Sequence, residues 1–526
     1  MSAAIYLPDE CWECVFRLLN NNQDHHCMES LSLVSKQFLS ITNRLRSSFA
    51  IHDDYPDTFL PRLLHRFPNL TSLDLKRFRG DLDALLLLIS RSPLRSLTSL
   101  SLFHDHTFPA DGLRALAENT KTFTSLTCSE GSIATADLHL ITDCFPFLQE
   151  LDLTFSKKFL GNRLRVERLP LALPKLLRKV NLSGESLNIN DEELISVCKN
   201  CEFLEELVIF SCPSITQHGI ASAIRQRPGL RSFSVDGLGR GSKRGDFERR
   251  FVTASFIDSL VSLKSLTCLE IRDSCISDEL LCSVAKEGLP LRKLVLDDCR
   301  NYNYAGISCL LSRCKFVQHL SLQRAKFLND QLVAELSVFL GSLISIDISS
   351  CMMLTESALL ALIRNCSLLS EIKMKVTGIG EEKFQYSNSF MNHCVKSLHL
   401  GWNLFLGDET IKMLSLVCPN LQVFDLRYCS SISEGGVVEV LKRSCKIRHL
   451  NLSHCSPMKL HGMNFEVPNV EVLSLAYSGI DDETLSVVSK SFSGLKYLDL
   501  ELCGNVTDKG VRQVVENCKQ LREINF

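Results

Sequence analysis

Hydrophobic positions recur at a regular spacing along most of the chain, and residues 421–434 (LQVFDLRYCSSISE) show the recurring unit most clearly. Leu421, Phe424 and Leu426 form the LxxLxL pattern of a short strand. Variants of this pattern return along most of the chain, and from Leu294 to Phe424 the middle residue recurs every 26 residues. Self-similarity at such a period indicates a repeat protein, in which each unit buries its apolar face against its neighbours.

The middle residues of the predicted strands define eighteen repeats: Leu73, Leu100, Leu126, Leu151, Val180, Leu207, Phe233, Leu269, Leu294, Leu320, Ile346, Ile372, Leu398, Phe424, Leu450, Leu473, Leu498 and Ile524. Helices are legible at residues 191–201, 356–366 and 508–518, each opening at an acidic residue that suits a helix N-terminus. One strand and one helix per period of about 20–29 residues is typical of leucine-rich repeats. We therefore expect an α/β leucine-rich-repeat solenoid over residues 51–526, a curved horseshoe of about 18 repeats with a parallel concave sheet.

Many of the 23 cysteines occupy fixed places in this period. One group lies five residues after the strand's middle residue: Cys212, Cys299, Cys351, Cys429, Cys455 and Cys503. A second group lies three residues before the next strand pattern begins: Cys201, Cys314, Cys366, Cys418 and Cys518. A small, weakly polar side chain suits a turn of the solenoid, so we expect buried thiols at both places.

The start of the chain, MSAAIYLPDECWECVF, does not predict a signal peptide, and no run of about 18 apolar residues predicts a membrane span. We therefore expect a protein of the cytosol or nucleus, with reduced cysteines. Zinc binding is the alternative use of cysteine, because Cys11–Cys14 and Cys198–Cys201 are CxxC pairs. Neither pair has a second pair at zinc-binding spacing, so we expect no metal and no other cofactor.

Residues 1–50 do not share the repeat and predict a small all-α domain. Residues 7–19 (LPDECWECVFRLL) open with a proline turn and continue with apolar residues at helical spacing. After a polar break, residues 30–41 (SLSLVSKQFLSI) form a second predicted helical run. A domain this small buries little surface, which favours packing on a neighbour or a partner.

These N-terminal residues resemble the F-box pattern in three blocks: LPDE at residues 7–10, apolar pairs at 15–16 and 18–19, and SLVSKQF at 32–38. The sequence departs from the pattern at Ser35, where the family often has cysteine, and at Phe38, where it often has tryptophan. The resemblance implies docking on the small helical adaptor of SCF-type ubiquitin ligases, which links to cullin and RING subunits. The residues that carry over are Leu7, Pro8, Val15, Phe16, Leu19, Leu33, Val34 and Lys36. The alternative is that these apolar positions form only the core of the domain.

The residue four places after each strand's middle residue lies where the strand leaves for the loop. In four successive repeats this residue is Trp402, Tyr428, His454 or Tyr477, and Arg427 is adjacent to the second. Because Trp, Tyr and Arg dominate interface hot spots, we predict that these five residues form a recognition ridge for a protein target. The alternative is that each ring packs over the loop below it.

One step of the period is longer than the others, and its surplus includes residues 237–251 (GLGRGSKRGDFERRF). Glycines and a run of basic residues predict a flexible, solvated loop insertion. A clamp for an acidic or phosphorylated partner is the functional alternative, because arginine pairs well with carboxylates and phosphates. A nuclear-localisation role is a weaker alternative.

The net charge of −2 gives no reason to expect binding to nucleic acid or to a membrane surface. GxSxG, HExxH and P-loop motifs are absent, so we predict no enzyme activity in the chain itself. The repeats resemble the cysteine-containing leucine-rich repeats often found behind an F-box, most similar in length to those of plants. This resemblance implies a substrate receptor of an SCF ubiquitin ligase that presents bound proteins for ubiquitination and proteasomal degradation.

Two alternatives stay open. The chain is a plain leucine-rich-repeat scaffold if the F-box-like segment serves only as an N-terminal cap, since terminal repeats need capping. It is a hormone co-receptor if target capture depends on a small molecule. The inositol phosphate site of some plant relatives is not carried over, because the predicted concave basic residues are scattered: Lys76, Arg272, Arg324, Lys373 and Lys375.

Overall fold

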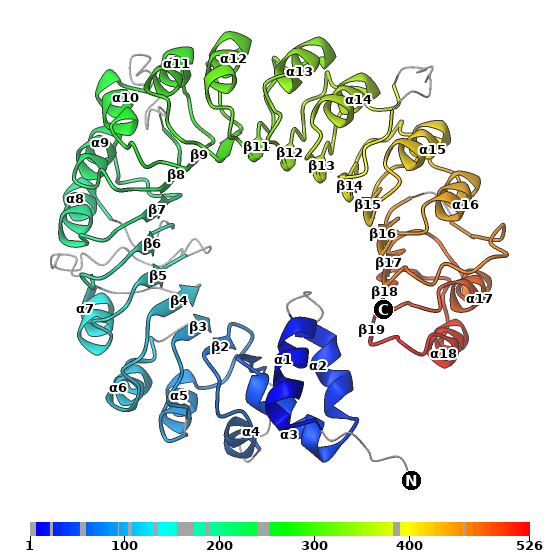
Figure 1. Cartoon of the computed structure of the whole chain (residues 1–526), viewed down its shortest axis with the longest axis horizontal. Helices are drawn as coiled ribbons and strands as arrows, with labels where there is room; N and C mark the ends of the chain where they lie inside the picture. The colour runs from blue at the N-terminus through cyan, green and yellow to red at the C-terminus, as the bar shows by residue number, and fades with distance from the viewer. Residues whose placement is uncertain are drawn as a thin grey trace. The chain divides into compact units, whose positions relative to one another are not determined.

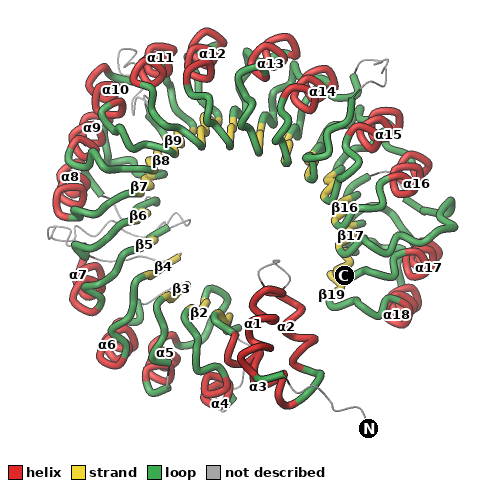
Figure 2. The backbone as a smooth tube through the Cα atoms, viewed as in Figure 1, coloured by secondary structure: helices red, strands yellow, loops and turns green. Residues whose placement is uncertain are grey.

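The computed structural model of the chain describes residues 7–20, 25–52, 59–92, 94–103, 108–129, 135–154, 173–184, 189–238, 252–381, 390–455 and 458–526. They fall into two compact units: unit 1 comprises Met1–Val235 and Thr253–Ser265, and unit 2 comprises Asp236–Val252 and Leu266–Phe526. In each unit parallel strands line the inner side and helices cover the outer side (Figures 1 and 2). Each unit is therefore an α/β leucine-rich-repeat solenoid, which confirms the predicted fold class.

Unit 1 opens with three helices and continues with strands and helices in alternation (Figure 1). The helices are α1 (Asp9–Asn20), α2 (His25–Ser32), α3 (Lys36–Leu45), α4 (Leu60–Arg66), α5 (Leu82–Ser90), α6 (Ala110–Asn119), α7 (Thr135–Cys144), α8 (Asp191–Asn200), α9 (Gln217–Arg225) and α10 (Ala254–Val261). The strands are β1 (Ser48–Ala50), β2 (Ser72–Leu75), β3 (Ser99–Phe103), β4 (Ser125–Ser129), β5 (Glu150–Asp152), β6 (Lys179–Asn181), β7 (Glu206–Ile209) and β8 (Ser232–Asp236).

Unit 2 repeats the same alternation. Its helices are α11 (Asp278–Glu287), α12 (Tyr304–Arg313), α13 (Asp330–Ser337), α14 (Glu356–Asn365), α15 (Asp408–Val417), α16 (Glu434–Arg443), α17 (Asp482–Ser491) and α18 (Asp508–Asn517). Its strands are β9 (Cys268–Arg272), β10 (Lys293–Asp297), β11 (His319–Ser321), β12 (Ser345–Asp347), β13 (Glu371–Lys373), β14 (Ser397–His399), β15 (Val423–Asp425), β16 (His449–Asn451), β17 (Val472–Ser474), β18 (Tyr497–Asp499) and β19 (Glu523–Asn525).

The predicted middle residues set the register of both sheets. Leu73 pairs with Leu100 and Leu100 with Leu126, and the series continues to Phe233 in unit 1. In unit 2 the series runs without a slip from Leu269 to Ile524. Inward-pointing apolar side chains define this register, since a slip by one residue would turn them to the solvent.

The structure adds a strand that the sequence pattern does not reveal. β1 pairs in parallel with β2, and Phe49 occupies the place of the middle residue opposite Leu73. The segment SFA lacks the LxxLxL spacing, so its only sequence signal is a single aromatic residue. The repeat therefore begins before the first predicted strand.

The cysteines of both groups lie at turns of the solenoid, as their spacing predicts. Each thiol of the first group donates to a carbonyl of the preceding repeat, as from Cys429 Sγ to Leu400 O at 3.4 Å and from Cys503 Sγ to Leu475 O at 3.2 Å. The cysteines of the second group are buried and are the C-cap residues of α8, α12, α14, α15 and α18. Burial raises the pKa of Cys198 to about 12 and that of Cys201 to about 11, so both are neutral thiols at pH 7.

A carboxylate joins neighbouring repeats on the helix side. Asp408, the first residue of α15, accepts hydrogen bonds from the backbone N–H and the hydroxyl of Ser433, the N-cap of α16, at 2.8 and 2.5 Å. The same bond pair joins Asp191 to Thr216, Asp330 to Thr355 and Asp482 to Thr507, and at Asp278 the side-chain amide of Asn303 donates in place of a hydroxyl. Aspartates in the first turn of these five helices, the predicted Asp191 among them, thus also connect each of the five to the next repeat.

Candidate functional site

The N-terminal helices are held together by a polar network and an aromatic cluster. Arg44 on α3 donates to Asp9 at 2.9 Å and to Glu13 at 3.0 Å, both on α1. Hydrogen bonds from Gln37 and Arg44 lower the pKa of Asp9 below its ordinary value. The ring of Phe38 lies 4.8 Å from that of Trp12 and 4.9 Å from that of Phe16. These contacts fix α1 against α3 and leave their other faces to the solvent.

The residues predicted to bind an adaptor divide into a surface set and a core residue. Phe16 is 1% exposed and belongs to the aromatic cluster, so it supports the surface from beneath. The surface set is Leu7, Pro8, Val15, Leu19, Leu33, Val34 and Lys36, all exposed. Leu18, three residues after Val15 and also exposed, extends the set on α1 beyond the residues that the resemblance assigns to adaptor binding.

The predicted helical run over residues 30–41 is interrupted. A turn separates α2 from α3, and Ser35 caps α3 by accepting a hydrogen bond from Phe38 N at 3.1 Å. Leu33 and Val34 occupy this turn and are 87% and 66% exposed. The cap at Ser35 therefore presents two apolar side chains to the solvent.

The four predicted ridge rings form one continuous column in unit 2. The ring centroids of Trp402 and Tyr428 are 3.6 Å apart, those of Tyr428 and His454 3.9 Å, and those of His454 and Tyr477 4.1 Å. The planes differ by only 11 to 16°. Because the rings cover one another's faces, the column presents ring edges along its length and open faces only at its ends.

The backbone explains this alignment. The residue four places after the strand's middle residue has a positive φ in every repeat from β9 to β18, including 66° at Trp402, 61° at Tyr428 and 55° at Tyr477. Its N–H donates to the next repeat, as from Trp402 N to Arg427 O at 2.7 Å and from Tyr428 N to Ser453 O at 2.9 Å. The left-handed conformation turns the chain at the same point in each repeat, so equivalent side chains stack.

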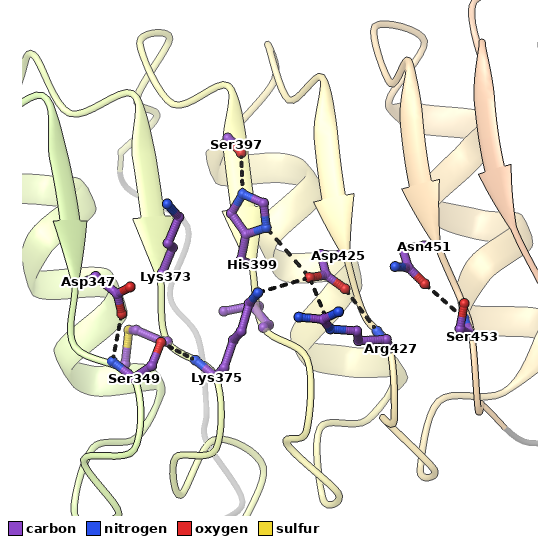
Figure 3. Close-up of polar contacts among 12 residues, drawn as sticks. Asp347, Ser349, Lys373, Lys375, Ser397, His399, Asp425, Arg427, Asn451 and Ser453 are labelled. Carbon is purple, nitrogen blue, oxygen red and sulfur yellow. Dashed lines mark hydrogen bonds and ion pairs between the residues drawn. The ribbon is translucent and has the colours of Figure 1, made fainter. Parts of the chain in front are cut away.

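Beside the column, a lysine, an arginine and a histidine side chain surround one carboxylate (Figure 3). Lys375 Nζ, His399 Nδ1 and Arg427 Nε approach Asp425 Oδ2 at 3.4, 3.6 and 3.6 Å. Arg427 Nε has no hydrogen-bond partner among the described residues. The N–H group at Arg427 Nε therefore makes no hydrogen bond within this cluster.

A glycine makes this cluster possible. Lys375 follows β13 and reaches Asp425 on β15 across the intervening repeat, where Gly401 occupies the equivalent position. A Cβ on Gly401 would lie 2.8 Å from Arg427 Cγ, closer than packed side chains allow. The missing side chain thus leaves room for Arg427, which shares the carboxylate with Lys375.

Hydrogen bonds and nearby positive charges keep the carboxylates of this cluster ionised. Burial alone would raise the pKa of Asp425, but the hydrogen bond with His399, the backbone N–H of Arg427 and the charges of Arg427 and Lys375 outweigh it and lower the pKa. Burial would also raise the pKa of Glu371, and the bond and charge of Lys373 outweigh it. Both carboxylates are therefore ionised at neutral pH.

The structure brings together all five predicted ridge residues and adds Lys375, His399 and Gly401. Lys373 and Lys375, predicted to be scattered basic residues, lie beside Arg427 and His399 in this cluster (Figure 3). The partners of these residues lie one or two repeats away, so a linear pattern gives no signal for them. Most of the predicted basic loop at 237–251 lies outside the described residues.

Across the part of the chain that the structure describes, no helix has the length and apolar character needed to cross a membrane. No known family profile matches the chain. It is 25% identical over 182 residues to F-box/LRR-repeat protein 4 of Bos taurus, covering 33% of this chain and 29% of that protein. It is 24% identical over 146 residues to BTB/POZ domain-containing protein FBL11 of Arabidopsis thaliana, covering 22% of this chain and 15% of that protein.

The matches therefore span less than a third of each curated relative. Among solved structures, the yeast Rad7 and Elc1 complex matches with a TM-score of 0.39 and 15% identity, over 97% of this chain and 96% of the other. The mouse RP105/MD-1 complex matches with a TM-score of 0.44 and 16% identity, over 91% and 86%. The curated relatives confirm the resemblance predicted from the sequence: the chain is similar to F-box/leucine-rich-repeat proteins.

Proposed function

We propose that the chain is the substrate receptor of an SCF ubiquitin ligase. Its F-box holds the small helical adaptor, and through it cullin and RING subunits, while the repeats hold a target protein. The apolar surface at the N-terminus carries this proposal, because Leu33 and Val34 expose 87% and 66% of their surface in a sequence context that matches the F-box. Exposed apolar side chains gathered on a small domain mark a protein interface.

In this proposal the chain supplies proximity and no reactive group. Ubiquitin passes from a conjugating enzyme to the target, and the receptor raises the rate by positioning the target's lysine. The aromatic column (Trp402, Tyr428, His454 and Tyr477) and Arg427 contact the target. The complex acts in the cytosol or nucleus and leads the target to proteasomal degradation.

The test is binding of the purified full chain to the SCF adaptor. Changing Leu33 and Val34 to glutamate is expected to weaken adaptor binding about 100-fold or more, because buried interface anchors are worth about 2 kcal/mol or more each. The matched control changes Phe316 and Leu368, which are 70% and 54% exposed in unit 2, to glutamate. The control variant is expected to bind the adaptor as the wild type does.

Two results favour other functions. Absence of adaptor binding by the wild type, or equal binding by the wild type and the Leu33→Glu/Val34→Glu variant, would favour a plain scaffold with an N-terminal cap. Adaptor binding combined with target capture only in the presence of a small molecule would favour a co-receptor.

A further inference from the structure

The charges on the concave face of unit 2 are unevenly distributed. The relevant positions are one residue before, one after and three after each strand's middle residue, opposite to the buried apolar positions. Lysine, arginine and histidine side chains gather at β13 to β15: Lys373, Lys375, His399 and Arg427. Their carboxylate partners are Glu371, which is 33% exposed and pairs with Lys373 at 3.1 Å, and Asp425, which is only 10% exposed against 41% for Arg427. Lys373, Lys375 and Arg427 outnumber these two carboxylates, so the net charge at these strands is positive.

The next two strands present small, uncharged side chains. Ser453 and Ser474 hydrogen-bond to each other at 2.6 Å, and Ala476 lies in the row of Ser453. Burial lowers the pKa of His449, which keeps this imidazole neutral at pH 7. Charged residues that immediately precede the strands pair with one another: Glu471 Oε2 lies 3.1 Å from Lys496 Nζ. The side chains that line this face over β16 and β17 are thus uncharged.

The last two strands present carboxylates. Asp499 lies on β18, Glu501 follows it, and Glu523 begins β19. Within the described ranges, no ion pair involves any of these three side chains, and Glu501 and Glu523 are exposed. The same face therefore changes from positive to negative along the strand order.

The aromatic column follows this face along the ends of β14 to β17. Its ring faces are covered by neighbouring rings, and ring edges carry partial positive charge. Carbonyl oxygens and aliphatic groups of a bound chain suit such edges. The column thus forms one wall of a track with a positive end, a neutral floor and a negative end.

We propose that this track binds an extended polypeptide segment with an anionic side chain near Lys375 and Arg427 and a basic side chain near Glu501. Strands about 4.8 Å apart place Arg427 and Glu501 about 14 Å apart, which an extended chain spans in about four residues. Nucleic acid does not fit, because its uniform negative charge meets unpaired carboxylates at one end. This inference rests on the proposed function and specifies the segment of the target that the receptor reads.

The test selects binders of the purified full chain from a displayed library of short random peptides. The expected consensus carries an acidic and a basic residue separated by about four positions. With the Glu501→Lys variant, the consensus peptide is expected to bind about tenfold or more weakly, since like charges replace opposite ones. Changing the peptide's basic residue to glutamate is expected to restore binding to this variant.

The matched control is Glu516→Lys on the outer helix α18, which changes the net charge equally at an exposed site and is expected to leave peptide binding unchanged. Synthetic consensus peptides with glutamate, phosphoserine or alanine at the anionic position distinguish carboxylate from phosphate as the anion. The alanine peptide is expected to bind most weakly. Whichever of the glutamate and phosphoserine peptides binds more tightly shows whether the preferred anion is a carboxylate or a phosphate.

Selected peptides without the charge pattern, no selected peptide at all, or a consensus that binds the Glu501→Lys variant as tightly as the wild type would each overturn the inference. Adaptor binding is measured on the same preparations. Loss of adaptor binding with a retained peptide pattern would refute the ligase role and leave the track standing. Adaptor binding without any patterned peptide would refute the track alone.

Discussion

Replacing Gly436 with alanine is expected to lower the free energy of unfolding by about 1–3 kcal/mol, because the added methyl group has no room. Gly436 is buried in the first turn of α16, and a Cβ there would overlap Oδ1 and Cγ of Asp408. That carboxylate holds Ser433 of the next repeat, so the methyl group pushes neighbouring repeats apart. Ala358 occupies the equivalent position in α14, so the repeat accommodates a methyl group by local adjustment, and the chain remains folded.

The control is one residue away. Gly435 is exposed, and the nearest atom to a Cβ there is Ser433 Oγ at 3.5 Å. Gly435→Ala is expected to raise the free energy of unfolding by about 0.5–1 kcal/mol through helix propensity. Removing the carboxylate with Asp408→Ala is expected to reduce the cost of Gly436→Ala, which a double-mutant cycle measures.

Long repeat arrays need not unfold in one step, so the measurement combines thermal melting with amide hydrogen exchange in α15 and α16. Faster exchange in these two helices is expected for Gly436→Ala. Equal effects of the two alanine substitutions would contradict a steric role for Gly436.

The sequence predicts the fold well because the solenoid repeats one local rule. Inward apolar residues at a fixed period determine strand positions, and the pairing of Phe424 with Leu398 and Leu450 follows from the spacing alone. The pattern does not reveal β1, because Phe49 is the only large apolar residue in this strand. The helix ends at residues 191, 356 and 508 are likewise predicted correctly, since acidic residues open each helix.

The geometry of the site depends on contacts between repeats, which a linear pattern does not show. The period places Trp402 and Tyr428 in one row, but their stacking follows from a left-handed backbone imposed by a hydrogen bond to the next repeat. Trp and Tyr give no signal of that conformation, unlike glycine or asparagine. Similarly, Arg427 packs beside Asp425 where Gly401 leaves room for its side chain, and this contact crosses from one repeat to the next.

The left-handed backbone at Tyr428 is expected to reverse the usual stability order of alanine and glycine substitutions. Alanine usually costs less than glycine, because glycine loses more conformational entropy on folding. At φ 61° a Cβ is strained, and glycine is not. Tyr428→Ala is therefore expected to be about 1 kcal/mol less stable than Tyr428→Gly, although both lose the ring contacts on either side.

Tyr497 is the matched control, since this tyrosine lies in β18 with ordinary strand geometry. There the usual order is expected, with Tyr497→Gly less stable than Tyr497→Ala by about 0.5–1 kcal/mol. Denaturant unfolding of the four variants tests both orders. Alanine more stable than glycine at both positions would contradict a strained backbone at Tyr428.

The same column gives a second, larger expected effect on target binding. Changing both Trp402 and Tyr428 to alanine removes two of the four rings and exposes a face of His454, so we expect target capture to be lost. Adaptor binding is expected to be unchanged, because it depends on unit 1 residues such as Leu33. Tyr428→Phe retains the ring and is expected to retain capture. Unchanged capture by the double variant would mean that the rings only pack against one another, and the target would then have to be held by the charged part of the face.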